Sequence, residues 1–213
     1  MAERVLHIVP ILHAEADLGR VARRLRDAVG EDAWRDRQDA IDQAWRAIAA
    51  WASELGDRGE SLHVFQDGLP VCGSATRIVR DLARKGSINH RILATLVDAG
   101  ATLVGTEDPA LLLEEYERVM AAANPQRASQ VSAHKDADGA RALLARRDRF
   151  IASRIDSQLP ASAEGVLFIG MLHDVAPMLP GDIRIEHPFG RPQAPHAQAH
   201  GPIHPKEQSD AER

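Results

Sequence analysis

Imidazole and carboxylate side chains follow the apolar, strand-like segments of this sequence. They are His13, Glu15 and Asp17 after the first segment, Asp67 after the second, Glu107 after the third, and His173 and Asp174 after the fourth. Since the carboxyl ends of parallel strands share one edge of a sheet, where ligands bind in open α/β folds, we expect these groups to converge there. Asp67 and Asp174 are candidate ligand-binding residues at this edge.

This set of side chains is suited to two kinds of chemistry. Imidazole and carboxylate groups together can bind Zn, Mn or Fe. The same groups can serve as general acid and base without a metal. Each also has a structural interpretation, since a histidine after a strand can donate to a nearby carbonyl, and Asp17 and Asp108 stand where helix N-caps are expected. His7 and His63 lie inside strands, and we expect them to be core or sheet-face residues.

The elements that position these residues alternate between strands and helices. Strands are predicted over 4–12, 61–66, 101–104, 166–170 and 182–186. Helices are predicted over about 18–29, 32–55, 74–85, 87–100, 109–123 and 138–158, with a turn at Asp67-Gly68, a loop over 69–73 and an exposed loop over 124–136. This alternation predicts an α/β fold in three layers, a mostly parallel sheet with helices on both faces.

Composition indicates one domain and a short tail. The 213 residues are 44% hydrophobic and 27% charged, which is typical of a globular protein. We expect a single α/β domain over residues 1–187. Residues 188–213 are rich in proline and histidine and poor in apolar side chains, so they are predicted to be disordered.

Charge and cysteine usage argue against several partners. The net charge of -5 and the aromatic content of 4% do not favour nucleic-acid binding. No apolar run reaches the roughly 18 residues of a membrane span, and no secretory signal is visible, so we expect no membrane partner. The single cysteine, Cys72, favours a reducing, cytoplasmic location and is expected to be a buried, inert thiol. Richness in Ala and Arg is typical of GC-rich bacterial genomes.

Two segments resemble the TraB/TIKI and ChaN/erythromycin-esterase-like superfamily. Residues 170–173 have the form G-x-x-H, and residues 10–13 have the same form with Pro10 in place of the glycine. Residues 146–152, RRDRFIA, are similar to the arginine-containing helix that precedes the last G-x-x-H strand in that group, with Asp148 where an asparagine is common.

The resemblance implies roles for several residues. His13 and His173 would be the metal-binding or catalytic histidines, Glu15 or Glu107 the acidic catalytic partner, and Arg147 an anion-facing or structural residue. The implied cofactor is a divalent ion, Zn, Mn or Fe. A plain interpretation of the arginines on this helix is a solvated face that pairs with neighbouring aspartates.

Two functions are therefore expected. The first is a metal-dependent hydrolase of the TraB/TIKI-like type, acting on a small molecule or peptide at the carboxyl ends of the strands. The second is a non-enzymatic ligand-binding or regulatory module that uses the same edge of the sheet. Metal content separates the two, because the first requires a bound ion and the second does not.

Overall fold

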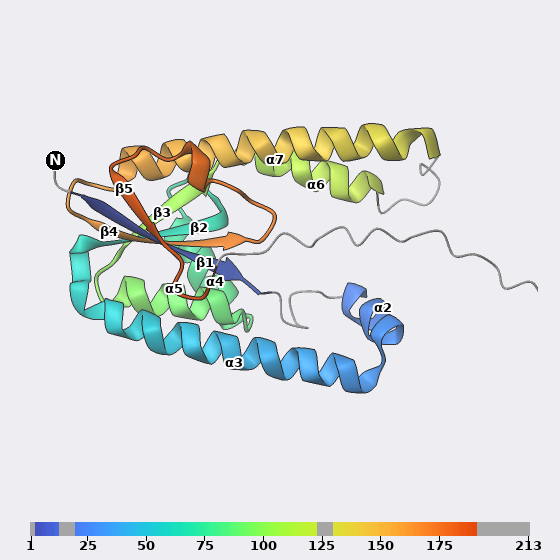
Figure 1. The fold of residues 1–213 in the computed structure, drawn as a ribbon, viewed down its shortest axis with the longest axis horizontal. Helices are drawn as coiled ribbons and strands as arrows, with labels where there is room; N and C mark the ends of the chain where they lie inside the picture. The colour runs from blue at the N-terminus through green and yellow to red at the C-terminus, as the bar shows by residue number, and fades with distance from the viewer. Residues whose placement is uncertain (1–2, 13–19, 123–129, 191–213) are drawn as a thin grey trace, which may run out of the picture.

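One parallel sheet forms the centre of the molecule. The computed structural model describes residues 3–12, 20–122 and 130–190. Its strands are β1 (Arg4–Ile11), β2 (Leu62–Pro70), β3 (Thr102–Glu107), β4 (Glu164–Gly170) and β5 (Ile183–Glu186). They lie in the order β3-β2-β4-β1-β5, and every neighbouring pair is parallel (Figure 1). All five predicted strands are confirmed, as is the α/β class, and β5 is an edge strand as its alternating pattern predicts.

Helices cover both faces of this sheet. They are α2 (Arg20–Val29), α3 (Glu31–Leu55), α4 (Ala75–Arg84), α5 (Ile88–Asp98), α6 (Pro109–Ala122) and α7 (Gln130–Gln158), with short 3₁₀ turns η1 (Gly56–Ser61) and η2 (Ala176–Met178). Figure 1 shows α6 and α7 above the sheet, and α3, α4 and α5 below it. The three-layer arrangement is therefore as expected.

The alternation of side chains along the strands gives each face its own core. On β4, Val166 and Phe168 pack with α3 and α5, whereas Leu167 and Ile169 pack with α7. All four are almost inaccessible to solvent. A strand that is apolar at successive positions is buried on both faces, and it can only lie in the middle of a layered structure. This places the end of β4, and His173 after it, at the centre of the sheet edge.

The prediction of a turn at Asp67-Gly68 is wrong, because β2 continues to Pro70. The register between β2 and β3 shifts between Gln66 and Pro70, which is a bulge inside the strand. Gly68 has φ +75°, a conformation that glycine adopts without a steric penalty. On β3, a Cβ at Gly105 would lie 2.6 Å from the Pro70 carbonyl oxygen, so the two backbones approach closely only because residue 105 is glycine. Asp67 therefore lies in a bulge of β2, between the paired residues Gln66 and Pro70.

Two other boundaries test the predicted elements. The backbone N–H of Ala110 donates to Asp108 Oδ1 at 2.8 Å, which confirms Asp108 as the N-cap of α6. The predicted loop over 124–136 is wrong from residue 130 onward, where α7 has already begun. The polar residues over 130–136 are compatible with the first turns of α7, since the later part of the same helix packs on the sheet. Residues 124–129, and most of the tail over 191–213, lie outside the described residues, while Phe189 packs edge-on against Trp51 at 5.5 Å.

Candidate functional site

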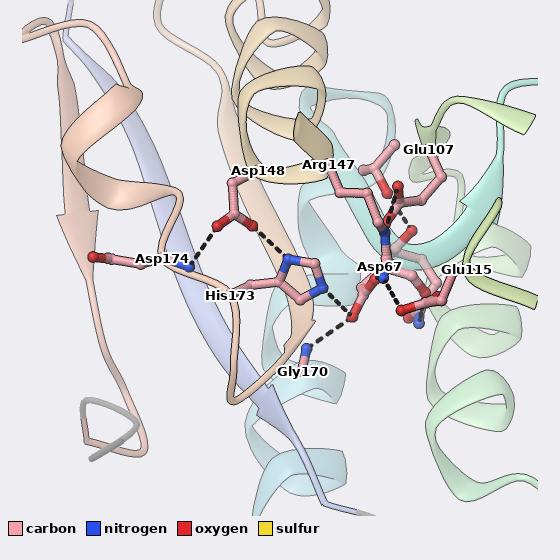
Figure 2. A network of polar contacts seen from close by, with 10 residues as sticks. Asp67, Glu107, Glu115, Arg147, Asp148, Gly170, His173 and Asp174 are labelled. Carbon is pink, nitrogen blue, oxygen red and sulfur yellow. Dashed lines mark hydrogen bonds and ion pairs between the residues drawn. The ribbon is translucent and has the colours of Figure 1, made fainter. Parts of the chain in front are cut away.

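His173 is held at a fixed orientation just past the end of β4. Its backbone N–H donates to the Gly170 carbonyl at 3.2 Å, which closes the turn after the strand. Its Nδ1 lies 2.5 Å from Asp148 Oδ1 on α7, and its Nε2 lies 3.4 Å from Asp67 Oδ2 on β2 (Figure 2). The side chain is only 5% exposed. An ionised carboxylate can only accept hydrogen bonds, so Nδ1 of His173 carries the proton that is donated to Asp148. The other ring nitrogen, Nε2, faces Asp67.

Arg147, one residue before Asp148, joins three carboxylates in the same cluster. Its Nη2 lies 2.6 Å from Glu107 Oε1 and 2.8 Å from Asp67 Oδ1. Its Nε donates to Glu107 Oε2 at 3.2 Å, so the contact with Glu107 is bidentate, and its Nη1 donates to Glu115 at 2.7 Å. A planar guanidinium fits this arrangement because its donors form a rigid fork.

Asp67 links the two halves of the cluster. One of its oxygens, Oδ1, accepts from Arg147, and the other, Oδ2, accepts from the backbone N–H of Gly170 at 3.0 Å and faces His173. A Cβ at Gly170 would lie 3.1 Å from Oδ2, so glycine at this position leaves room for the carboxylate. The G-x-x-H segment therefore positions both the histidine and its acidic neighbour.

Burial and surplus negative charge shift the proton affinities. Burial raises the pKa of Glu107; Arg147 opposes this rise and Asp67 adds to it, so the pKa of Glu107 stays above its ordinary value. Burial alone would lower the pKa of His173, but the Asp148 carboxylate and the charge of Asp67 outweigh it and raise the pKa. The pKa of Arg147 is raised as well, because the attraction of Glu107, Asp67 and Glu115 exceeds the effect of burial. Glu107 and His173 thus both hold protons more tightly than in water.

Three of these side chains have the spacing of a metal ligand set. Asp67, Glu107 and His173 each offer one ligand atom, and the three atoms lie within 4.8 Å of one another. Asp67 lies in the bulge of β2, Glu107 at the end of β3 and His173 just past the end of β4, and these are three adjacent strands of the sheet. The convergence predicted from the sequence thus occurs for these three residues, with Arg147 beside them.

The other predicted site residues have different outcomes. Asp174 is exposed, and its side chain points away from the cluster in Figure 2; only its backbone N–H contributes, donating to Asp148 Oδ2 at 3.3 Å. His13, Glu15 and Asp17 lie outside the described residues, so the pairing of His13 with His173 stays a prediction. The strand before them ends beside the cluster, since β1 and β4 are neighbours and Ile11 is opposite Gly170.

Two expectations about side chains are wrong. Cys72 is exposed rather than buried, because it lies in the turn between β2 and α4. Arg147 and Asp148 do not belong to a solvated face, since each residue is 5% exposed. The solvated-face interpretation holds for exposed Arg141, which pairs with Asp138 at 3.3 Å. It does not hold for Arg154, which donates to the Gly105 carbonyl at 3.2 Å, nor for Asp156, which pairs with Arg4.

Sequence reasoning missed Asp148 and Glu115 as members of the cluster. A signal for this face of α7 was present, since Leu143, Arg147, Ile151 and Ile155 recur at intervals of four residues. These four residues share the face of α7 that packs on the sheet, so Arg147 must be buried with them. A buried charge requires an oppositely charged partner. Glu115 gives no comparable signal, since exposed apolar side chains such as Leu113 and Tyr116 flank it on α6 and no apolar stripe marks its face.

Comparisons with known proteins add no relative. No protein-family model matches the chain, and neither the curated proteins nor the solved structures include a significant match. The structure itself shows an α/β protein with a largely buried His/carboxylate/Arg cluster at the carboxyl edge of a parallel sheet. The TraB/TIKI-like assignment stays a prediction. Within the described residues, no helix has the length and apolar character to cross a membrane.

Proposed function

We propose that this protein is a metal-dependent hydrolase in which Asp67, Glu107 and His173 bind a divalent ion. The observation that carries the proposal is the orientation of His173. Its Nδ1 is 2.5 Å from Asp148, and its Nε2 faces the two acidic ligand candidates. Metal-binding histidines commonly have this arrangement, in which a carboxylate at one ring nitrogen fixes the tautomer and makes the other nitrogen a better ligand.

The distances are compatible with an ion. Two ligands of a tetrahedral site at about 2.1 Å from the metal stand about 3.4 Å apart, and His173 Nε2 and Asp67 Oδ2 are separated by 3.4 Å. Glu107 accepts from Arg147 through both oxygens, but each carboxylate oxygen has two lone pairs, which leaves acceptor capacity. The mixed nitrogen and oxygen donors favour Zn, Mn or Fe.

The charge balance also favours a cation. Four carboxylates surround two side chains that can carry a positive charge, Arg147 and His173. The carboxylates are those of Asp67, Glu107, Glu115 and Asp148. A buried cluster with surplus negative charge is stabilised by a bound cation. Arg147 satisfies one side of Asp67 and of Glu107, while the side that faces His173 has no cationic side chain other than the histidine among the described residues.

The chemistry follows from these roles. A bound divalent ion supplies a Lewis acid and lowers the pKa of a coordinated water. Arg147 fixes Glu107 and Asp67 in place, and Asp148 fixes the ring of His173. The predicted water-activating carboxylate is Glu15 or Glu107; the bidentate contact with Arg147 makes Glu107 better suited to hold the ion, and Glu15 lies outside the described residues. The substrate class, whether peptide, ester or phosphoester, is open to assay.

A second candidate is a ligand-binding or regulatory module without turnover. The burial of the cluster favours it, since the side chains of His173 and Glu107 are 5% and 0% exposed. A substrate must reach a catalytic ion, whereas a module that only contacts a partner at this edge needs no access to the buried side chains. The two candidates share this edge of the sheet, but only the first requires a bound ion and turnover.

Metal content and turnover test the proposal together. The protein is stripped with a chelator, reloaded with Zn, Mn or Fe, and assayed on peptide, ester and phosphoester substrates. We expect about one ion per chain and turnover that requires it, and both should be lost in Asp67→Asn. Asp182→Asn is the matched control, an aspartate paired with the buried Arg4 at the opposite end of the sheet. Metal without turnover would contradict the hydrolase, and absence of stoichiometric metal would contradict the metal site and favour the second candidate.

A further inference from the structure

An arginine-lined hollow lies along α4, outside the Asp67/Glu107/His173 cluster. Arg77, Arg80 and Arg84 are spaced by three and four residues, so they share one face of the helix. Together with Gly73, Ser74 and Thr76 at the start of the helix, they line an open hollow of about 520 Å³. A concave surface with three guanidinium groups is suited to an anion rather than to an apolar ligand.

Local charge in this hollow differs from that of the whole protein. The chain has a net charge of -5, yet the three arginines face only two described acidic partners, Asp98 and Asp81. Arg80 pairs with Asp98 at 2.7 Å, with side chains 55% and 61% exposed, so this pair is weak and can exchange for another anion. Arg77 donates to the Ser74 hydroxyl at 3.1 Å, a neutral partner that leaves its charge uncompensated.

The helix end adds donors at one end of the hollow. The Ser74 side chain, which stands at the N-cap position, does not cap α4 in the described structure. The first backbone N–H groups of a helix and its dipole favour an anion at this end. From Arg77 to Arg84 the helix advances about 10 Å, so the arginine row is longer than a single phosphate group.

We propose that the hollow along α4 binds a linear oligophosphate, either free or as the phosphate chain of a nucleotide. The terminal phosphate lies at the start of α4 near Ser74 and Arg77, and the following phosphates contact Arg80 and Arg84. Several linked anionic groups match a row of guanidinium groups, whereas one phosphate can engage only part of it. This binding needs no metal and is independent of the proposed hydrolase site.

One pair of variants with expected effects of opposite sign tests this proposal. Binding of inorganic tripolyphosphate is measured by calorimetry at low ionic strength in chelator-treated, metal-free buffer, with orthophosphate as the shorter anion. Arg80→Ala should weaken tripolyphosphate binding roughly tenfold, because a charge-assisted contact is lost. Asp98→Asn should strengthen it several-fold, because Arg80 no longer has a competing carboxylate.

Matched controls lie on α7, where exposed Arg141 pairs with Asp138 as Arg80 does with Asp98. Arg141→Ala and Asp138→Asn change the net charge equally and should leave affinity unchanged. The proposal is overturned if tripolyphosphate does not bind at millimolar concentration, if orthophosphate binds equally well, or if each control shifts affinity as much as its partner. A nucleoside triphosphate that binds as tightly as tripolyphosphate, or more tightly, supports the site and identifies a nucleotide as a possible source of the anion. Tighter binding of a single-stranded oligonucleotide would overturn the small-anion assignment.

Discussion

Arg4 and Arg147 are both buried arginines that bind several carboxylates, yet their surroundings differ. Arg4, at the start of β1, contacts Asp156 and Asp182 at 2.9 Å and donates to the carbonyls of Asp156 and Leu159. Its two acidic partners are 51% and 37% exposed. Arg147, at the opposite edge of the sheet, contacts Glu107, which is fully buried, and Asp67, which is 13% exposed.

This difference separates a structural clamp from a candidate site. Around Arg4 the carboxylates can be solvated, and the arginine joins the start of β1 to the end of α7 and to the segment before β5. Around Arg147 two of the three carboxylates, Glu107 and Asp67, are desolvated, and Asp67 also faces His173 at 3.4 Å; only Glu115 is solvated, at 45% exposed. The number of ion pairs therefore says little about function, whereas burial of surplus acidic groups beside an imidazole points to chemistry.

The largest effect is expected for Arg147→Met. This change leaves Glu107 buried without its bidentate partner, and removing one member of a buried pair costs about 3–5 kcal/mol. Urea unfolding of metal-free protein measures this loss. Stability within 1 kcal/mol of wild type would contradict the view that Arg147 compensates the charge of Glu107.

The double variant Glu107→Gln with Arg147→Met sharpens this prediction. Neutralising Glu107 removes the stranded charge, so the double variant should be more stable than Arg147→Met alone, with a coupling of about 1–3 kcal/mol. The same unfolding assay on all four proteins gives the coupling. Additive losses would show that the two side chains do not depend on each other.

Arg4→Met should cost less than Arg147→Met, about 1–2 kcal/mol, because Asp156 and Asp182 can be solvated and their attraction is screened. Two carbonyl acceptors also lose a donor, so the cost is not zero. Unfolding midpoints of the two methionine variants give the comparison directly. An Arg4→Met loss equal to or greater than that of Arg147→Met would remove the distinction between clamp and site.

The smallest effect is a pH dependence of opposite sign in the two regions. The folded-state pKa of His173 is raised above 6.5, so its contribution to stability is fully present below pH 6.5 and is lost as pH rises through the folded-state pKa. The pKa of Asp182 is lowered by Arg4, so its contribution is present above pH 3.8 and is lost as pH falls through the folded-state value.

Unfolding of metal-free wild type, His173→Gln and Asp182→Asn between pH 3 and 9 tests both signs. The stability difference between wild type and His173→Gln should shrink with rising pH, and the difference for Asp182→Asn should shrink toward acid. A His173 difference that grows above pH 6.5 would show that the neutral imidazole is the form that the fold favours.

The sequence predicts the sheet well because its strands have a clear apolar pattern. Val166–Gly170 is apolar or glycine throughout, and a segment of this kind fits only a strand buried on both faces. His173 and Glu107 could be placed for the same reason, since each lies at the end of such a strand. The order of strands, which makes β2, β3 and β4 adjacent, is a property of tertiary packing and has no local signal.

The rest of the site depends on features with weak or ambiguous sequence patterns. Asp67-Gly68 has the composition of a turn, but Gly105 on β3 lets the backbones approach and β2 continues as a bulge. Arg147 and Asp148 lie among other charged residues, so their local composition suggests a solvated face. The recurrence of apolar residues every four positions marks the face of Arg147, but for Asp148 only the packing of α7 against β3 and η2 shows that the side chain points inward.

The central claim is that Asp67, Glu107 and His173 bind a divalent ion. Its most direct test is a crystal structure of protein loaded with Zn or Mn, with anomalous scattering measured at the metal edge. The account predicts a peak about 2.0–2.3 Å from His173 Nε2 and from carboxylate oxygens of Asp67 and Glu107, with Nδ1 still bound to Asp148. An ion found elsewhere, or no peak among these three side chains in metal-loaded crystals, would contradict it.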